Sequence, residues 1–144
     1  MCPKYSNGTF KCPQYPAYPF HENYVEGNVW HYNFDVPHDL EGMVNLYPSK
    51  EAFIEKLEKN LVGSTETDEF LFQSNWFPNP YYWQGNEHDL LFPWLFHAGD
   101  REDLTQYWTR WILENRYSEF SEGLPGLNFY FILFFILFLY LLID

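Results

Sequence analysis

The chain has 144 residues, enough for one small domain with a hydrophobic core and too short for two. Charged residues make up 19% and hydrophobic residues 47%, which excludes both a disordered acidic chain and a uniformly apolar membrane bundle. Eight Lys and Arg against twenty Asp and Glu give a net charge of -12. This charge argues against nucleic acid as a partner, because neutralising phosphates requires a basic surface.

Two features near the N-terminus have meaning only in particular compartments. A small disulfide loop between Cys2 and Cys12 requires an oxidising environment. Asn7-Gly8-Thr9 is an N-glycosylation acceptor sequence, which matters only in an exported chain. No apolar stretch typical of a signal peptide is visible at the start of the chain. These residues therefore leave the localisation open.

Two helices are predicted in the first half of the chain. Pro37 is expected to begin a helix of one or two turns over residues 38–45, since proline is favoured at the first helical position. A longer helix is predicted from Ser49 to about Val62, with Gly63 as its C-terminal stop. Its apolar residues recur at helical spacing and form one stripe: Phe53, Ile54, Leu57 and Leu61.

Two more helices are predicted in the second half, and strand patterns are weak throughout. A short apolar helix over residues 90–98 ends at Gly99, with Pro93 tolerated near its first turn. A longer helix runs from Asp103, as its N-cap, to about Tyr117. Its stripe consists of Leu104, Tyr107, Trp108, Trp111 and Ile112. The chain is therefore expected to be mostly helical, with long loops.

The composition changes sharply after Gly126, which predicts a division into residues 1–126 and residues 127–144. Residues 127–143 form an apolar run that is expected to be a hydrophobic C-terminal helix. Seventeen residues are at the lower limit for spanning a bilayer, and no Lys or Arg flanks the run. Three interpretations stay open: a membrane anchor, a buried segment, or translated AT-rich non-coding sequence.

Two loop segments carry the candidate chemistry, at residues 24–32 and 82–89. Each places a carboxylate, Glu26 or Glu87, beside a Gly and an Asn and between Trp and Tyr. Glycine lets a backbone approach a ligand closely, and a carboxylate can act as an acid, a base or a metal ligand. Taken alone, the pattern favours solvated loop carboxylates, because most Asp and Glu side chains are exposed.

Taken together, these segments resemble the signature of glycoside hydrolase family 92, the calcium-dependent exo-α-mannosidases. Residues 26–32 and 37–42 resemble the family's E-G-N-x-W-Q-Y and P-H-D-x-x-G, and residues 85–88 resemble its G-N-E-P. The other segments that match in the same order are Gly8-Thr9-Phe10, Ala98-Gly99, Thr105-Gln106, Tyr117 and Glu122-Gly123-Leu124-Pro125-Gly126.

The resemblance implies an inverting glycosidase whose catalytic domain is an (α/α)₆ toroid preceded by a β-sandwich domain. Complete members of the family are several times longer, so these residues would form one incomplete arc of the toroid. α-Mannoside glycans are the implied substrates, and the family pattern implies an extracellular or secretory location. The remainder of the toroid is then an implied partner.

The resemblance also implies roles for individual residues. Glu26 matches the general acid, which protonates the departing glycosidic oxygen. Trp30, Asn86 and Glu87 fall on positions expected to bind the mannose or to surround the calcium ion, and Glu87 is the candidate calcium ligand. Calcium prefers oxygen ligands of this kind. Asp39, in the Pro-His-Asp segment, is expected to cap the helix that follows it.

Departures from the family pattern bear on activity. His31 stands where the family has Gln, and His88 stands where it has Pro. After Gly126 the family continues with N-D-D, whose acidic residue activates the attacking water, whereas this chain enters its apolar run. An inverting mechanism needs two carboxyl groups about 6.5–9.5 Å apart. The chain is therefore expected to carry the acid without the base, and to be inactive as written.

Two further functions stay open. The chain is alternatively a non-catalytic carbohydrate-binding remnant, tethered to a membrane through residues 127–143, or a different (α/α)₆ glycosidase in which Glu87 and Asp89 form the acid–base pair. All of these interpretations predict that a partial toroid exposes apolar residues that normally need a partner. The residues expected to be exposed are Phe96, Trp108 and Trp111.

Overall fold

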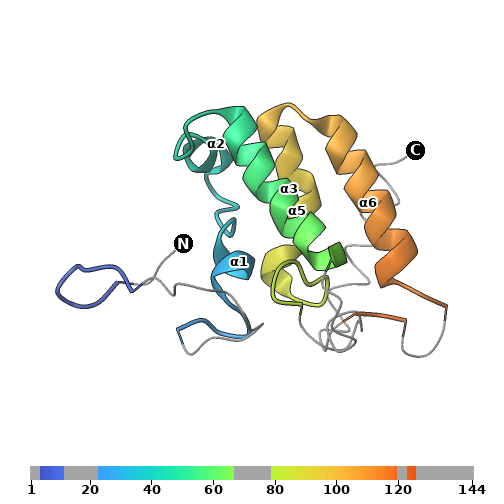
Figure 1. Cartoon of the computed structure of the whole chain (residues 1–144), viewed down its shortest axis with the longest axis horizontal. Coiled ribbons are helices and arrows are strands. Elements are labelled where there is room, and N and C mark those ends of the chain that lie inside the picture. Colours follow the sequence, from blue (N-terminus) through green and yellow to red (C-terminus); the bar gives the residue numbers. More distant parts are fainter. Residues whose placement is uncertain (1–3, 12–22, 67–78, 120–122, 126–144) are drawn as a thin grey trace.

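The computed structural model describes residues 4–11, 23–66, 79–119 and 123–125, and these ranges are mostly helical (Figure 1). Strand structure in them is limited to one antiparallel bridge between Lys4 and Phe10. The elements in chain order are α1 (Val29–Tyr32), α2 (Leu40–Val44), α3 (Lys50–Glu66), η1 (Glu87–Asp89), α5 (Phe92–Leu95), η2 (Phe96–Gly99) and α6 (Glu102–Arg116). The predicted helical class is confirmed.

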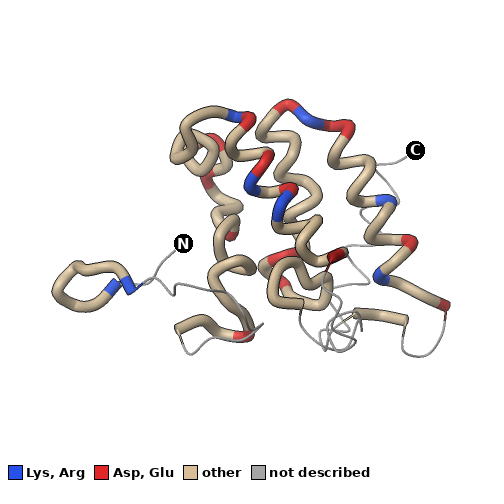
Figure 2. The backbone as a smooth tube through the Cα atoms, in the orientation of Figure 1, with Lys and Arg blue, Asp and Glu red and all other residues tan. Residues whose placement is uncertain are grey.

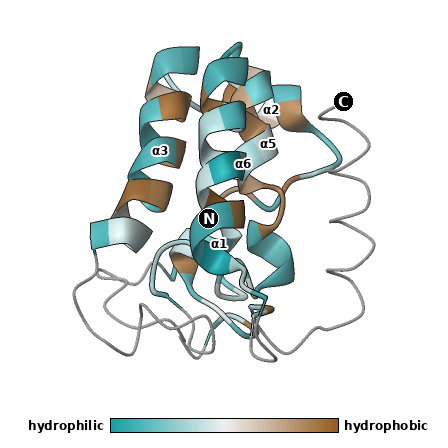
Figure 3. Ribbon diagram, turned by 90° about the vertical axis from the view of Figure 1, so that its right-hand side faces the viewer, coloured by the Kyte–Doolittle hydropathy of each residue, from teal (hydrophilic) through white to brown (hydrophobic). Residues whose placement is uncertain are grey.

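The 3₁₀ segment η2 lies at the centre of the helical body and contacts α2, α3, α5 and α6. In Figure 3 the hydrophobic parts of α3 lie toward the neighbouring helices and its hydrophilic parts point outward. Gly99 permits this packing, because a Cβ there would lie 2.3 Å from Cδ1 of Ile54 on α3. The Ala98-Gly99 match therefore has a packing role in this structure.

Aromatic rings make up much of the core between these elements. Phe34 lies edge-on to Phe53 and Phe92, with ring centroids 5.9 and 5.2 Å apart. The whole predicted stripe of α3 is buried, which confirms it: Phe53, Ile54, Leu57 and Leu61. Each such side chain contributes about 1.5–3 kcal/mol on burial, so α3 is held by packing and not by its own helix propensity.

α3 continues for one turn beyond its predicted end, and Gly63 lies inside the helix. The stop predicted at Gly63 is therefore wrong. Tyr81, from the segment that precedes η1, packs its ring against this glycine, so that a Cβ would lie 2.8 Å from the ring carbon Cγ. Gly63 marks a close contact with Tyr81, and not a helix terminus.

Gly63→Ala is expected to destabilise the chain, although alanine is the better helix former by about 0.5–1 kcal/mol. Forcing a methyl group against the Tyr81 ring costs about 1–3 kcal/mol, which outweighs that gain. Urea unfolding of the full chain measures the net change. In a Tyr81→Ala background the same substitution should become stabilising. A loss of stability that persists without the Tyr81 ring would contradict this account.

The remaining helix ends differ from the predicted ones by a few residues. α6 begins at Glu102, so Asp103 is not its N-cap; the Asp103 carboxylate instead accepts two 2.7 Å hydrogen bonds from Arg101.

α2 begins at Leu40, after Pro37, and Asp39 caps it by accepting a 2.8 Å bond from the Gly42 amide. The predicted cap at Asp39 is confirmed. The segment predicted over residues 90–98 divides into α5 and η2, with Pro93 in the first turn as expected.

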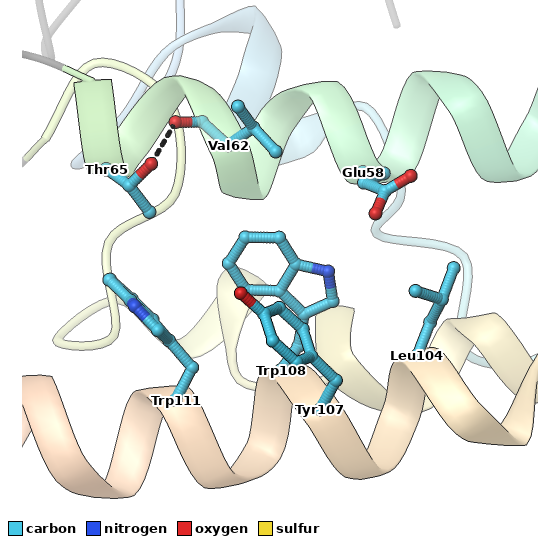
Figure 4. Close-up of a pocket in the computed structure, with 7 residues that line it drawn as sticks. All are labelled: Glu58, Val62, Thr65, Leu104, Tyr107, Trp108 and Trp111. Carbon is cyan, nitrogen blue, oxygen red and sulfur yellow. Dashed lines mark hydrogen bonds between the residues drawn. The ribbon is translucent and has the colours of Figure 1, made fainter.

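The expected exposure of two core aromatics is wrong. Phe96, in η2, and Trp108, in α6, are 0% and 3% exposed, and both elements pack against α5. Trp111 is half-buried, and its neighbour Tyr107 is 57% exposed. Tyr107, Trp108 and Trp111 line one side of a groove of about 390 Å³ between α3 and α6 (Figure 4). The full lining consists of Glu58, Val62, Thr65, Leu104, Tyr107, Trp108 and Trp111.

Several predictions fall on residues outside the described ranges. These are the apolar run 127–143, the boundary after Gly126, and the pair Cys2 and Cys12. Within the described ranges, no helix is both long enough and apolar enough to cross a bilayer. The division of the chain at residue 126 remains a prediction.

Candidate active site

The structure brings together the two loop segments that the sequence singled out. Asn86 Nδ2 donates a 3.0 Å hydrogen bond to the backbone carbonyl oxygen of Glu26, 60 residues away in the chain. Asn28 Nδ2 donates a second bond, of 2.8 Å, to the carbonyl oxygen of Pro80. Both amides are almost fully buried. The contact between the segments is therefore built from interior hydrogen bonds and is not a loose apposition of surface loops.

Glu26 is held in an unusual backbone conformation. Its φ angle is 52°, in the left-handed region that costs a residue with a side chain about 1–3 kcal/mol. The carbonyl groups before and after the Glu26 Cα atom both accept hydrogen bonds. Asn86 donates to the carbonyl of Glu26, and the Tyr32 hydroxyl donates to that of Val25 at 2.7 Å. The Glu26 side chain is exposed. The loop thus presents this carboxylate to solvent from a strained and well-anchored backbone.

Asn28 begins α1, a short helix that the sequence analysis treated as loop. Its Oδ1 accepts a 2.7 Å hydrogen bond from the Trp30 amide. In return, the Nδ1 atom of His31 accepts a hydrogen bond from the Asn28 amide. This is a capping box in which His occupies the place usually taken by Glu or Gln. The signal that predicts α1 is therefore Asn28 followed three residues later by an acceptor.

His31 is fully buried and neutral in this arrangement. Its Nδ1 accepts from the Asn28 amide at 3.3 Å, and its Nε2 lies 2.7 Å from the Asn79 carbonyl oxygen, to which it donates. A neutral imidazole with its proton on Nε2 satisfies both contacts. Burial lowers the pKa of His31 to about 4, and the nearby His88 charge acts in the same direction.

Asp89 lies beneath the same loop and is also fully buried. Its Oδ2 accepts a 2.7 Å hydrogen bond from the Trp83 amide, and burial raises the pKa of this carboxyl well above its ordinary value. The 3.8 Å separation from His31 Nε2 exceeds hydrogen-bond distance. Asp89 is therefore buried while Glu87 is exposed, and the interpretation of these two residues as an acid–base pair stays a prediction.

The other predicted site residues differ in how open they are. Glu87 is exposed at the start of η1. Trp30 is half-buried: the Lys56 ammonium lies 3.8 Å from the centre of its ring, and the Tyr81 ring packs at 5.3 Å. Sequence reasoning missed the role of His88, which bonds Asp35 at 3.0 Å and packs on the Tyr32 ring at 4.0 Å.

The order and spacing of these segments agree with a known family. The profile of the glycosyl hydrolase family 92 catalytic domain matches residues 1–128. The chain belongs to glycosyl hydrolase family 92. It is 26% identical, over 135 residues, to a protein of Arthroderma benhamiae described as an uncharacterized secreted glycosidase. That match covers 86% of this chain and 15% of the relative, so the chain spans about 15% of the relative's length.

Family 92 enzymes depend on calcium in general, so the residues of this chain are compared with what a calcium site needs. Calcium takes six to eight oxygen ligands. Within the described ranges no three His, Cys, Asp or Glu side chains converge on a possible metal position. The side-chain nitrogen of Asn86 donates to the Glu26 carbonyl, and Glu87 is a single exposed carboxylate. The described residues therefore do not form a calcium site by themselves.

Calcium titration of the full chain is accordingly expected to show no saturable binding below about 10⁻³ M, the weak end of protein calcium sites. Glu87→Gln should leave the calorimetric trace unchanged, because one exposed carboxylate contributes little alone. A dissociation constant in the micromolar range, lost in Glu87→Gln, would contradict this prediction and identify a site within these 144 residues.

Proposed function

We propose that residues 1–126 are the general-acid segment of an inverting family 92 α-mannosidase, with Glu26 protonating the departing glycosidic oxygen. The observation that carries this proposal is the hydrogen bond from Asn86 Nδ2 to the Glu26 carbonyl oxygen, which joins the two loops that bear the family's motifs. The exposed Glu26 carboxylate beside that junction is free to meet a leaving group.

An aromatic surface beside Glu26 supports a sugar as the ligand. The rings of Tyr24 and Tyr32 lie 5.3 Å apart, and the His88 ring continues the cluster at 4.0 Å from Tyr32. All three residues are half-buried, so part of each ring remains accessible. Flat apolar rings with polar edges suit the faces of a pyranose. We assign the α-linked mannose of glycans to this surface.

The supporting residues have separate roles in this proposal. Asn86 positions the Glu26 backbone. Trp30 stabilises the end of the Glu26 loop through its contacts with Lys56 and Tyr81. Glu87, exposed next to Asn86, is the residue placed to contact the sugar or a calcium ion when the rest of the domain supplies further ligands.

The proposed segment is one arc of an (α/α)₆ toroid and does not hydrolyse α-mannosides alone. Family 92 places its water-activating carboxylate after the Gly-Leu-Pro-Gly segment, where this chain continues into residues 127–143. An inverting reaction without that second carboxylate lacks its general base. We therefore expect the full chain to release no mannose from an α-mannobioside.

A chimera tests the proposal directly. Residues 1–126 replace the matching segment of the Arthroderma benhamiae glycosidase, and release of mannose from an α-mannobioside is followed by NMR in the presence of calcium. The first product should be β-mannose, since inversion at the anomeric carbon is expected. Glu55→Gln, an exposed change on the outer side of α3, is the matched control and should be silent. Release of α-mannose first, or no release when the parent enzyme is active, would refute the assignment.

A second candidate function is favoured by the apolar run. If residues 127–143 are translated as written, the chain is a non-catalytic carbohydrate-binding remnant with a hydrophobic tether. Sequencing the transcript beyond the Gly126 codon separates the two functions. An Asn-Asp-Asp continuation in another exon favours the mannosidase, and a continuous apolar reading frame favours the remnant.

A further inference from the structure

Residues 4–11 form a hairpin that lies apart from the helical body (Figure 1). Its turn is closed by two 2.9 Å hydrogen bonds, from the Tyr5 amide to the Thr9 carbonyl and from the Gly8 amide to the Tyr5 carbonyl. Gly8 has a φ of 85°, a conformation that favours glycine. All the bonds of this turn are local, so the tip forms without help from the helices.

Asn7 occupies the tip of this hairpin, and its side chain is engaged by Thr9. The Asn7 Oδ1 atom accepts 3.0 Å and 2.8 Å hydrogen bonds from the Thr9 amide and the Thr9 hydroxyl. Both residues are exposed. Among the described residues, Asn7 Nδ2 makes no hydrogen bond, so the nitrogen faces outward while the oxygen is held.

The surroundings of Asn7 leave room for a large substituent. Lys4 and Lys11 lie at the end of the hairpin near the rest of the chain, where each ammonium lies over an aromatic ring, and no charged residue lies at the tip (Figure 2). Asn7-Gly8-Thr9 is also the one Asn-x-Ser/Thr sequence in all 144 residues. An enzyme that recognises this sequence therefore has a single acceptor site in the chain.

We propose that Asn7 is an N-glycosylation site and that the 4–11 hairpin displays its glycan. In the transfer, Asn7 Nδ2 attacks C1 of an oligosaccharide carried on a lipid pyrophosphate. The N–C1 bond forms, the C1–O bond breaks, the lipid pyrophosphate leaves with the electron pair, and the proton lost from Nδ2 passes to a base of the transferring enzyme. The Thr9 hydroxyl donates to Asn7 Oδ1, at the other end of the amide, and thereby makes the Nδ2 protons more acidic.

This inference is independent of the proposed hydrolysis. The hairpin is separate from the Glu26 loop in sequence, and nothing in the modification requires a second carboxylate or a complete toroid. What it requires is passage through a compartment that holds the lipid-linked donor.

Expression of the full chain behind a cleavable export signal in yeast tests the proposal. The signal-processed chain should carry one N-glycan, visible as a mobility shift that peptide-N-glycosidase removes. Asn7→Gln and Thr9→Ala should each abolish the shift. Thr9→Ser keeps the hydroxyl and should retain it, which distinguishes the sequence requirement from a general effect on folding.

A reporter acceptor sequence on a flexible linker before Met1 shows that each molecule reached the donor. Chains that carry the reporter glycan and none at Asn7 would overturn the proposal. Chains that carry both glycans in the parent, and the reporter glycan alone in Asn7→Gln, would support it. Because the hairpin is closed by its own bonds, the variants should leave the thermal unfolding of the helical body unchanged.

Discussion

Glu26→Gln in the chimera is expected to lower hydrolysis of an α-mannobioside by about 10²–10⁴-fold, the usual contribution of a general acid. A sugar alkoxide leaves poorly without a proton, whereas dinitrophenolate leaves readily without one. Activity on a dinitrophenyl α-mannoside should therefore fall far less. The ratio of the two losses, measured as kcat/KM, isolates proton donation from binding.

Variants around Glu26 refine this expectation. Asn86→Asp removes the Nδ2 donor that holds the Glu26 carbonyl, so the α-mannobioside should again be the more affected substrate, by a smaller factor than in Glu26→Gln. Glu55→Gln should change neither substrate. Equal losses on both substrates in Glu26→Gln would show that the residue binds or folds and does not donate the proton.

Lowering the pH from 7 to 4 is expected to remove up to about 3 kcal/mol of stability from the full chain relative to its His31→Gln variant. Burial lowers the pKa of His31 from 6.5 to about 4 in the folded state. Above pH 6.5 the imidazole is neutral in both states and titration contributes nothing. Below that value the unfolded chain binds a proton that the folded chain rejects, so stability falls with falling pH until about pH 4.

The structural consequence of protonating His31 is local and specific. A proton on Nδ1 removes the acceptor of the Asn28 amide, which opens the capping box of α1 and loosens the loop that holds Glu26. The glutamine side chain introduced by His31→Gln does not titrate. The substitution should therefore flatten the acid side of the stability profile.

Urea unfolding of both proteins at pH 7, 6, 5 and 4 measures this difference. Asp89 opposes the trend in both proteins, because burial raises the pKa of its carboxyl and favours the folded state when it is protonated. His97→Gln, at an exposed position on η2, is the matched control and should follow the parent chain. A difference between parent and His31→Gln that stays constant with pH would contradict the prediction.

The sequence was sufficient for the long helices and insufficient for their ends. The apolar stripes of α3 and α6 follow directly from a helical period, and the stripe of α3 is buried as predicted. The stop at Gly63 failed because Tyr81, eighteen residues downstream, takes the space that the glycine leaves. α1 was missed because four residues are too few to show a period.

The same limit applies to the candidate site. Motif residues identified both loops, and family membership is confirmed by the profile match. Nothing in the local pattern indicates that Asn86 bonds the Glu26 backbone or that His31 and Asp89 are buried beneath it. These contacts join residues 48 to 60 positions apart in the chain, and such pairs depend on packing that no local window contains.

The junction between residues 26–31 and residues 79–89 also sets an order during synthesis. A ribosome delivers the N-terminal segment first, so Glu26 emerges long before Asn79, Asn86 and Asp89 have been translated. α1 is too short to persist as an isolated helix, and the Glu26 carbonyl, next to the left-handed backbone of this residue, is held by Asn86 from the later segment. The Glu26 loop is thus among the first segments made, yet its hydrogen bond to Asn86 forms only after a segment 60 residues downstream has left the ribosome.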